Sequence, residues 1–260
     1  MTCARAILAQ ALATIGASPS ATQRVVLVPW LVSIVAYYGV DVSAYGSLSG
    51  PSYFDGAAVD TLFETGPAAG WYWLSAFVSI GAWLWLAVGW HRYVLAGEAP
   101  SGWWPPFHLV RAATYLGKLI LTFLPALPPL ICVVVAITVA TPDEVYWAPS
   151  AGAVISDTVM AFAIMFVAMY FGLRLGPILP AAALDQPMKL VDAWRKTAPY
   201  RWTILRLSAI LAALTLPFSV ALSVAADNDM IYFMANAIYD LGSFLGIAVL
   251  TVFYSLLLAK

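Results

Sequence analysis

Residues 119–140 read LILTFLPALPPLICVVVAITVA, a run of 22 residues without a charged side chain. A helix needs about 20 consecutive apolar residues to cross the roughly 30 Å hydrocarbon core of a bilayer. This stretch therefore predicts a membrane-spanning helix. Within it, Pro125, Pro128 and Pro129 predict a kink, because proline removes backbone hydrogen bonds that neighbouring helices must then replace.

Five further apolar stretches predict five more spanning helices. The composition agrees, since 63% of the 260 residues are hydrophobic and only 10% are charged, which leaves too few polar side chains to cover a soluble domain. We expect an all-α polytopic membrane protein, a single integral membrane domain over residues 1–260 with six transmembrane helices. The expected spans are about 25–40, 71–90, 119–140, 153–173, 207–226 and 237–259.

The charged residues mark the two sides of this predicted bundle. If the N-terminus is cytoplasmic, all twelve Lys and Arg fall on the cytoplasmic side and ten of the thirteen acidic residues fall outside. Basic residues concentrate on the cytoplasmic side of bacterial inner-membrane proteins. The sequence thus predicts the bacterial inner (cytoplasmic) membrane with both termini in the cytoplasm. The net charge of -1 gives no reason to expect nucleic acid as a partner.

An amphipathic stretch at the N-terminus predicts a helix at the membrane surface. Residues 4–16 place Ile7, Leu8, Leu12 and Ile15 on one side. Gln10 and Thr14 interrupt the apolar run, so an interfacial helix is favoured over a signal peptide.

Two long cytoplasmic connections are expected, 91–118 and 174–206, and the second is rich in basic residues. Asp185 is expected to cap the start of a helix there, and Lys or Arg beside a membrane gains about 1 kcal/mol from anionic headgroups. The predicted surface for an anionic lipid or a cytoplasmic partner comprises Lys189, Trp194, Arg195, Lys196 and Arg201. The alternative is that these residues only set the topology and anchor the chain, as basic cytoplasmic loops generally do.

Two stretches of these connections carry a resemblance. They read WHRYVLAGEAP at 90–100 and LPAAALDQPMKLVDAWRKT at 179–197, and each has an acidic residue followed two positions later by proline. They resemble small bacterial polytopic proteins similar to the YciC-like and glycerophosphodiester-phosphodiesterase membrane-domain groups. The resemblance implies six helices with interfacial helices and carries over no catalytic residue. The shared pattern of the two connections is also consistent with an internal duplication.

The two histidines are the candidates for metal or haem chemistry. His91 and His108 lie near the expected cytoplasmic boundary with Glu98 between them, so all three are candidate metal ligands and the two imidazoles are candidate haem ligands. The alternative is that both are membrane-boundary residues, with His91 where the second span meets water. The sequence contains no nucleotide-binding loop, serine nucleophile elbow or metalloprotease motif. We therefore expect no catalytic residues, no metal and no cofactor.

The sequence places no ionisable residue near the middle of the membrane. Asp240 lies 20 residues before Lys260, about 30 Å along a helix, which assigns it to the outer boundary near Asp157 and Asn236. Proton- or ion-coupled transporters usually keep an ionisable residue near the bilayer midplane. This assignment therefore argues against a secondary transporter.

Small residues recur every four positions on the last two predicted spans. Such stripes let helices approach closely, either inside the bundle or against a separate membrane subunit. The residues are Ala209, Ala213, Ala221 and Ala225 on the fifth span and Gly242 and Gly246 on the sixth.

These features favour a non-enzymatic protein that acts by association. We expect an accessory, assembly or scaffolding subunit of a membrane protein complex, or a membrane-organising protein, with membrane lipids and other membrane protein subunits as partners. Two alternatives stay open. The proline-rich third span and a Ser/Thr stripe on the fifth indicate a channel or carrier for a small neutral or amphipathic solute. The interfacial histidines indicate a lipid-modifying intramembrane enzyme.

Overall fold

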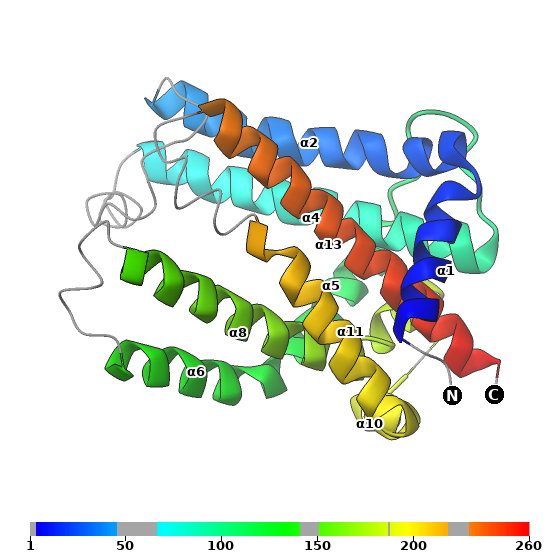
Figure 1. Ribbon diagram of the computed structural model, residues 1–260. Coiled ribbons are helices and arrows are strands. Elements are labelled where there is room, and N and C mark those ends of the chain that lie inside the picture. Colours follow the sequence, from blue (N-terminus) through cyan, green and yellow to red (C-terminus); the bar gives the residue numbers. More distant parts are fainter. Residues whose placement is uncertain (1–3, 46–66, 141–150, 187, 218–228, 260) are drawn as a thin grey trace.

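Every regular element of the described residues in the computed structural model is a helix (Figure 1). The structure describes residues 4–45, 67–140, 151–186, 188–217 and 229–259. The expected all-α class is confirmed. The elements are α1 (Ala4–Gly16), α2 (Pro19–Tyr45), α4 (Pro67–Ala96), α5 (Leu109–Phe123), η1 (Leu124–Ala126), α6 (Leu127–Ala140), α8 (Ala151–Leu175), α9 (Ile178–Ala183), α10 (Leu190–Thr197), η2 (Ala198–Tyr200), α11 (Arg201–Leu214) and α13 (Asp229–Leu258).

Five helical segments of the described chain are long and apolar enough to cross a membrane. They are Pro19–Gly39, Trp73–Ala96, Leu109–Ala136, Thr158–Leu175 and Met230–Leu258. This length and composition identify a polytopic membrane protein. The expected fifth span, 207–226, begins within α11, and its part from residue 218 onward lies outside the described residues.

A break divides the third apolar segment into α5 and α6. Pro125 has no N–H to donate and its ring clashes with the carbonyl one turn back, so the chain takes a 3-10 turn over Leu124–Ala126. Pro128 and Pro129 then fall in the first turn of α6, where a helix does not use their N–H groups. The predicted kink is confirmed.

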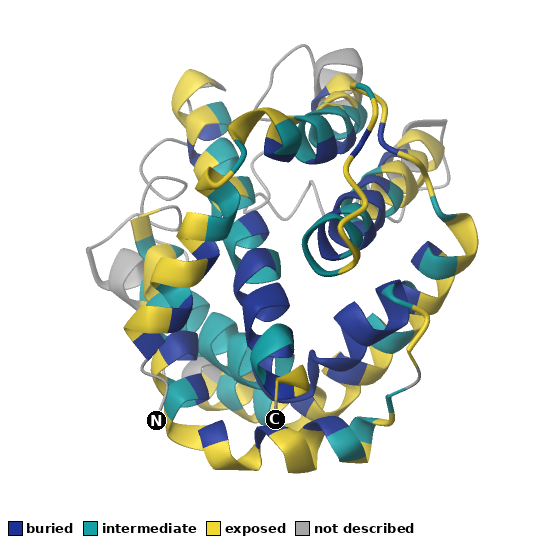
Figure 2. Cartoon of the chain, turned by 90° about the vertical axis from the view of Figure 1, so that its right-hand side faces the viewer, coloured by how far each residue is buried: buried dark blue, intermediate teal, exposed yellow. Residues whose placement is uncertain are grey.

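The core of the bundle forms around the C-terminal half of α13. Val249 and Phe253 have no exposed surface, and Tyr254 is 1% exposed. α13 packs against α1, α4, α9 and α11. Figure 2, viewed from the end where both termini lie, shows the exposed residues mainly on the outer surface of the surrounding helices. The N-terminal helix contributes Ile7 and Ala11 to this core, so α1 is packed into the bundle as well as amphipathic.

Part of the second connection folds back into the core. All six residues of α9 are buried, and α9 packs against α4, α5 and α13. The chain reaches α9 through a tight turn at Gly176, where a β-carbon would overlap the carbonyl oxygen of Gly172. The expected cytoplasmic connection 174–206 is therefore only partly a surface segment.

Several element boundaries differ from the predicted spans. α4 continues to Ala96, six residues past the predicted end at 90, and α5 begins at Leu109, inside the expected connection 91–118. α13 begins at Asp229, eight residues before the predicted start at 237. The prediction stops each span near a charged residue, whereas a helix continues past a charge whose side chain reaches a partner or the membrane surface.

The predicted N-cap role of Asp185 is wrong. α10 begins after Lys189, whose side chain makes no capping hydrogen bond. Asp185 instead follows the end of α9 with a φ of 57°, in the left-handed region that Asp enters more readily than most residues. Its carboxylate is engaged by Arg111.

Gly176→Ala should destabilise the fold by about 1–3 kcal/mol, because the added methyl group overlaps backbone and the turn must shift. Gly172→Ala is the matched control, since a β-carbon there meets nothing within 4 Å. The control should be neutral or slightly stabilising, by up to about 1 kcal/mol, because alanine favours the helix. Apparent melting temperatures of the purified variants in detergent measure both effects. Equal melting temperatures for the two variants would contradict the close approach at Gly176.

Candidate functional site

A cavity of about 540 Å³ lies between α1, α2, α4 and α13. Its volume falls in the range of roughly 300–1,000 Å³ that is typical of small-molecule sites. Asp240 is the one ionisable residue among the described residues that line it. Apart from Thr22 and Gln23 the remaining lining residues are apolar or aromatic, and they include Trp30, Trp83 and Phe244.

Asp240 lies within α13, eleven residues after the start of that helix at Asp229. α13 is about 45 Å long, more than the thickness of the membrane core, so the predicted place of Asp240 at the outer boundary stays a prediction. The midpoint of α13 falls between residues 243 and 244, one helical turn from Asp240. The indole Nε1 of Trp30 donates a hydrogen bond of 2.9 Å to Asp240 Oδ2. Trp30 is itself two residues from the midpoint of α2. The pair is therefore close to the middle of both helices.

The Asp240 carboxylate is only half satisfied. Trp30 is its one hydrogen-bond donor among the described residues, and it donates to Oδ2 alone. Asn236, which the sequence places nearby, donates instead to the carbonyl of Tyr232, one turn back on α13. A carboxylate in hydrocarbon with a free oxygen and no cation beside it is costly. Asp240 therefore has unused capacity to bind a donor or a positive charge.

The cavity is elongated along the axis of α2. Thr22 and Trp30 both line it and are eight residues apart on α2, about 12 Å along the helix axis. This approaches the roughly 15 Å that one leaflet contributes to the hydrocarbon core. At the Thr22 end, its hydroxyl donates 2.9 Å to the carbonyl of Ile15 at the end of α1. The cavity thus runs from α1 to the level of Asp240.

His91 is buried in the core with no exposed surface, so the prediction that it meets water is wrong. Its Nδ1 lies 2.9 Å from Thr251 Oγ1 and its Nε2 lies 3.1 Å from the Tyr115 hydroxyl. Thr251 donates its own hydroxyl hydrogen to the carbonyl of Ile247 at 2.8 Å. His91 Nδ1–H must therefore donate to Thr251, which leaves Nε2 to accept from Tyr115. Both ring nitrogens are satisfied in a neutral imidazole.

Tyr115→Phe should lower the free energy of unfolding by about 1–3 kcal/mol, because it leaves the buried His91 Nε2 without a donor. Tyr93→Phe is the matched control, since its hydroxyl makes no hydrogen bond to the described residues and its loss should have little effect. Chemical or thermal denaturation in detergent measures the difference. If Tyr115→Phe is as stable as the control, the histidine contact is not structural.

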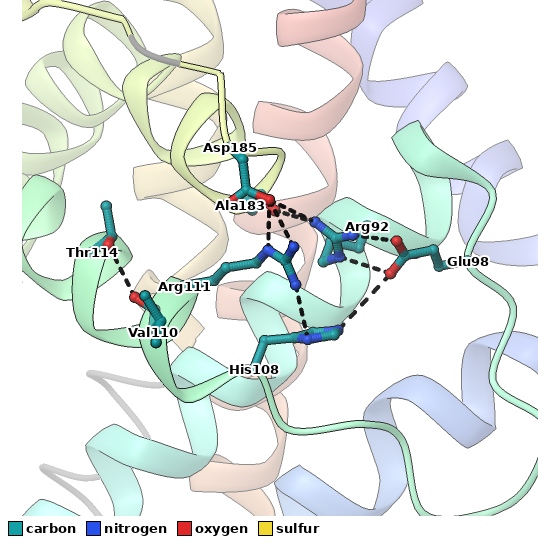
Figure 3. A network of polar contacts seen from close by, with 8 residues as sticks. All are labelled: Arg92, Glu98, His108, Val110, Arg111, Thr114, Ala183 and Asp185. Carbon is teal, nitrogen blue, oxygen red and sulfur yellow. Dashed lines mark hydrogen bonds and ion pairs between the residues drawn. The ribbon is translucent and has the colours of Figure 1, made fainter.

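A cluster of charged and polar side chains, which we call the polar network, joins the two predicted connections (Figure 3). It comprises Arg92, Glu98, His108, Arg111 and Asp185. Arg92 pairs with Glu98, donating from Nε to Oε2 at 2.7 Å, and also donates to the carbonyl of Ala183 at 2.8 Å. Arg111 pairs with Asp185, donating from Nε to Oδ2 at 2.8 Å. The acidic residues of the two resembling stretches therefore meet in one place. The polar network therefore connects the end of α9 and the residues after α4 to α4 and α5, the helices that carry the two arginines.

The polar network keeps both carboxylates ionised and its histidine neutral. The hydrogen bond from Arg92 holds the pKa of Glu98 below its usual range, and that from Arg111 does the same for the pKa of Asp185. Burial, reinforced by the positive charges of Arg111 and Arg92, lowers the pKa of His108. Arg111 Nη1 lies 3.0 Å from His108 Nδ1, which fits an imidazole that accepts there.

Acidification should destabilise the protein through His108. In the unfolded chain His108 takes up a proton near its ordinary pKa of 6.5, whereas in the folded chain its pKa is lower. The stability that is present above about pH 6.5 is therefore lost as the pH falls. Glutamine does not titrate, so the apparent melting temperature of His108→Gln should fall less than that of the wild type between about pH 7.5 and about pH 5.5. Protonation of Glu98 and Asp185 lowers the stability further only nearer pH 4, because the ordinary pKa values of these carboxyl groups are 4.5 and 3.8. Parallel pH profiles for the two proteins would exclude this role of His108.

The three candidate metal ligands do not converge. Glu98 Oε2 and His108 Nε2 are 3.9 Å apart, but both nitrogens of His91 face Thr251 and Tyr115. In the part of the chain that the structure describes, no group of three His, Cys, Asp or Glu side chains is placed to hold a metal ion. The two imidazoles likewise do not share an axial geometry, since His91 is fully engaged in the core.

The predicted basic surface lies around α10 and is exposed. α10 buries Ala193 and Thr197 and leaves its charged side outward. The exposed residues include all five that the sequence predicts, Lys189, Trp194, Arg195, Lys196 and Arg201.

A buried cation lies beneath this surface. Arg174 is 4% exposed, and its Cζ is 4.0 Å from the centre of the Trp194 ring. Its Nε and Nη1 find no hydrogen-bond partner within the described part of the chain. Arg174 lies in the last turn of α8, where the negative end of the helix dipole offsets part of the cost of burial. The sequence reasoning treats Arg174 only as a marker of topology.

The small-residue stripes are not packed inside the described bundle. Ala209 is half-buried and Ala213 is exposed, while Ala221 and Ala225 lie outside the described residues. A β-carbon at Gly242 or Gly246 would meet nothing within 4 Å. Gly242 lines the cavity and Gly246 does not. These positions therefore leave space beside α13.

Comparison with protein family models, curated proteins and solved structures found no match to this chain. The similarity to the YciC-like and phosphodiesterase membrane-domain groups therefore stays a prediction from short motifs.

Two residues of the cavity escape the sequence reasoning for different reasons. Asp240 is noticed there as a boundary residue, but its contact with Trp30 is not predicted, because the two residues are 210 positions apart in the sequence. Trp30 is not singled out, although an indole N–H near the middle of an apolar stretch needs a partner. The need of the Trp30 indole for an acceptor is the sequence signal that points to an acidic residue on another span.

Proposed function

We propose that this chain is a non-enzymatic multi-pass protein of the bacterial inner membrane that binds an amphipathic molecule from within the bilayer. The observation that carries the proposal is the cavity that ends at the half-satisfied carboxylate of Asp240. An apolar cavity of this volume with one polar group at depth fits a molecule that has an apolar body and one polar end. The protein acts by association, and the bound molecule is carried or held in place.

The charge distribution supports the proposed orientation. Both termini lie at the same end of the bundle (Figure 1), and the sequence rules place every basic residue on that side. We assign this end to the cytoplasm. The cavity then belongs to the cytoplasmic leaflet, because it begins at α1 beside the N-terminus and ends near mid-helix.

An accessory, assembly or scaffolding subunit of a membrane complex is the second candidate. It is favoured by α6, none of whose described side chains is buried and whose Ile131, Val135 and Val139 are 55–82% exposed. Lipid covers such a surface by default, and a partner helix also fits it. Under this alternative the α10 surface and α6 are the contact surfaces, and the cavity is incidental.

Gly242→Phe should abolish retention of the amphipathic molecule, because it adds a large side chain at a residue that lines the cavity and where a β-carbon would meet nothing within 4 Å. Gly246→Phe is the control, with the same substitution one turn away and outside the cavity lining. Native mass spectrometry of the full chain, purified in mild detergent, counts bound molecules per protein. We expect about one in the wild type and in Gly246→Phe and none in Gly242→Phe. Equal retention by the two variants favours the accessory-subunit function.

A further inference from the structure

We infer that the cavity selects a lipophilic organic cation, a molecule with one delocalised or alkylated positive charge inside an apolar body. This inference rests on the proposed function, since it names the class of ligand for the same cavity. It depends on the charge, aromatic lining and position of that cavity.

No positively charged side chain among the described lining residues balances the negative charge of Asp240. Asp240 has no Lys or Arg beside it among the described lining residues, and its one hydrogen bond comes from a neutral indole. A carboxylate in an apolar cavity lowers its energy by meeting a positive charge, and the attraction is strong where little water screens it. A cation that enters makes the pair neutral overall, whereas an anion brings a second negative charge.

The walls suit a cation whose charge is spread over an apolar body. Trp30, Trp83 and Phe244 line the cavity, and aromatic faces attract organic cations at desolvated sites. A compact, strongly hydrated ion such as Na⁺ finds no set of oxygen ligands here, because Thr22 lies at the far end of the cavity from Asp240. A lipophilic cation needs no such set, since it enters from the bilayer with little bound water.

The position of the cavity fits entry from the membrane. Ile238 and Leu241, which also line it, are 52% and 64% exposed on the outer surface of α13. Molecules dissolved in the cytoplasmic leaflet therefore reach Asp240 without crossing the core. The α1 end carries only the uncharged polar residues Thr22 and Gln23, which leaves Asp240 as the charged determinant.

The test uses two probes of matched size and opposite charge, tetraphenylphosphonium and tetraphenylborate. Equilibrium dialysis of the full chain in detergent, corrected with protein-free micelles, measures the binding of each. We expect the wild type to bind the phosphonium about tenfold more tightly than the borate. Asp240→Asn keeps an acceptor oxygen for Trp30 but removes the charge, so it should lose this preference. Asp192→Asn, on α10 away from the cavity, should keep it.

Three results would overturn the inference. They are equal binding of both ions by the wild type, tighter binding of the borate, and an unchanged preference in Asp240→Asn. The first two results are measured on the wild type, so either would overturn the inference even if Asp240→Asn fails to fold. If neither ion binds but Gly242→Phe still loses its endogenous molecule, the ligand is a neutral amphiphile and the proposed function stands. If neither ion binds and nothing is retained by the wild type, both proposals fail.

Discussion

Polar side chains within a bilayer have little water to bind, so each needs a partner within the protein. This constraint organises the bundle around α13, which carries Asp240 and Thr251 eleven residues apart, about 16 Å along the axis. Asp240 meets Trp30 of α2, and Thr251 meets His91 of α4. The packing of α13 against its neighbours therefore decides where every buried polar contact of this region forms.

The two contacts differ in how completely they are satisfied. His91, Thr251, Tyr115 and the Ile247 carbonyl form a chain in which every described donor has an acceptor. Such a group rigidifies the core and leaves nothing for a ligand. Asp240 has one donor for two oxygens among the described residues, and it lines the cavity. The polar network resembles the first case, since Arg92 and Arg111 saturate Glu98 and Asp185.

The sequence predicts the helical class, the apolar segments and the break at Pro125 because each depends on local composition and backbone chemistry. It does not predict that α13 begins eleven residues before Asp240. The residues before it, DMIYFMANAIY at 229–239, contain no charge after Asp229, and the helix continues through them. It also expects His91 to meet water, whereas His91 is buried between Thr251 and Tyr115, which come from distant segments. Depth and pairing are tertiary properties, and one sequence records neither.

The position of Asp240 also changes the interpretation of the low charge content. Only 10% of the residues are charged, and sequence rules assign nearly all of them to the two membrane faces. A charge that marks topology works as well at a helix end, where water solvates it at no cost. At mid-helix the same carboxylate destabilises the bundle unless something binds it, and an indole N–H offsets only part of that cost. Asparagine or glutamine in its place would accept the same hydrogen bond from Trp30 without a buried charge. Packing alone does not require an acid at this position, whereas the proposed cationic ligand would bring the opposite charge.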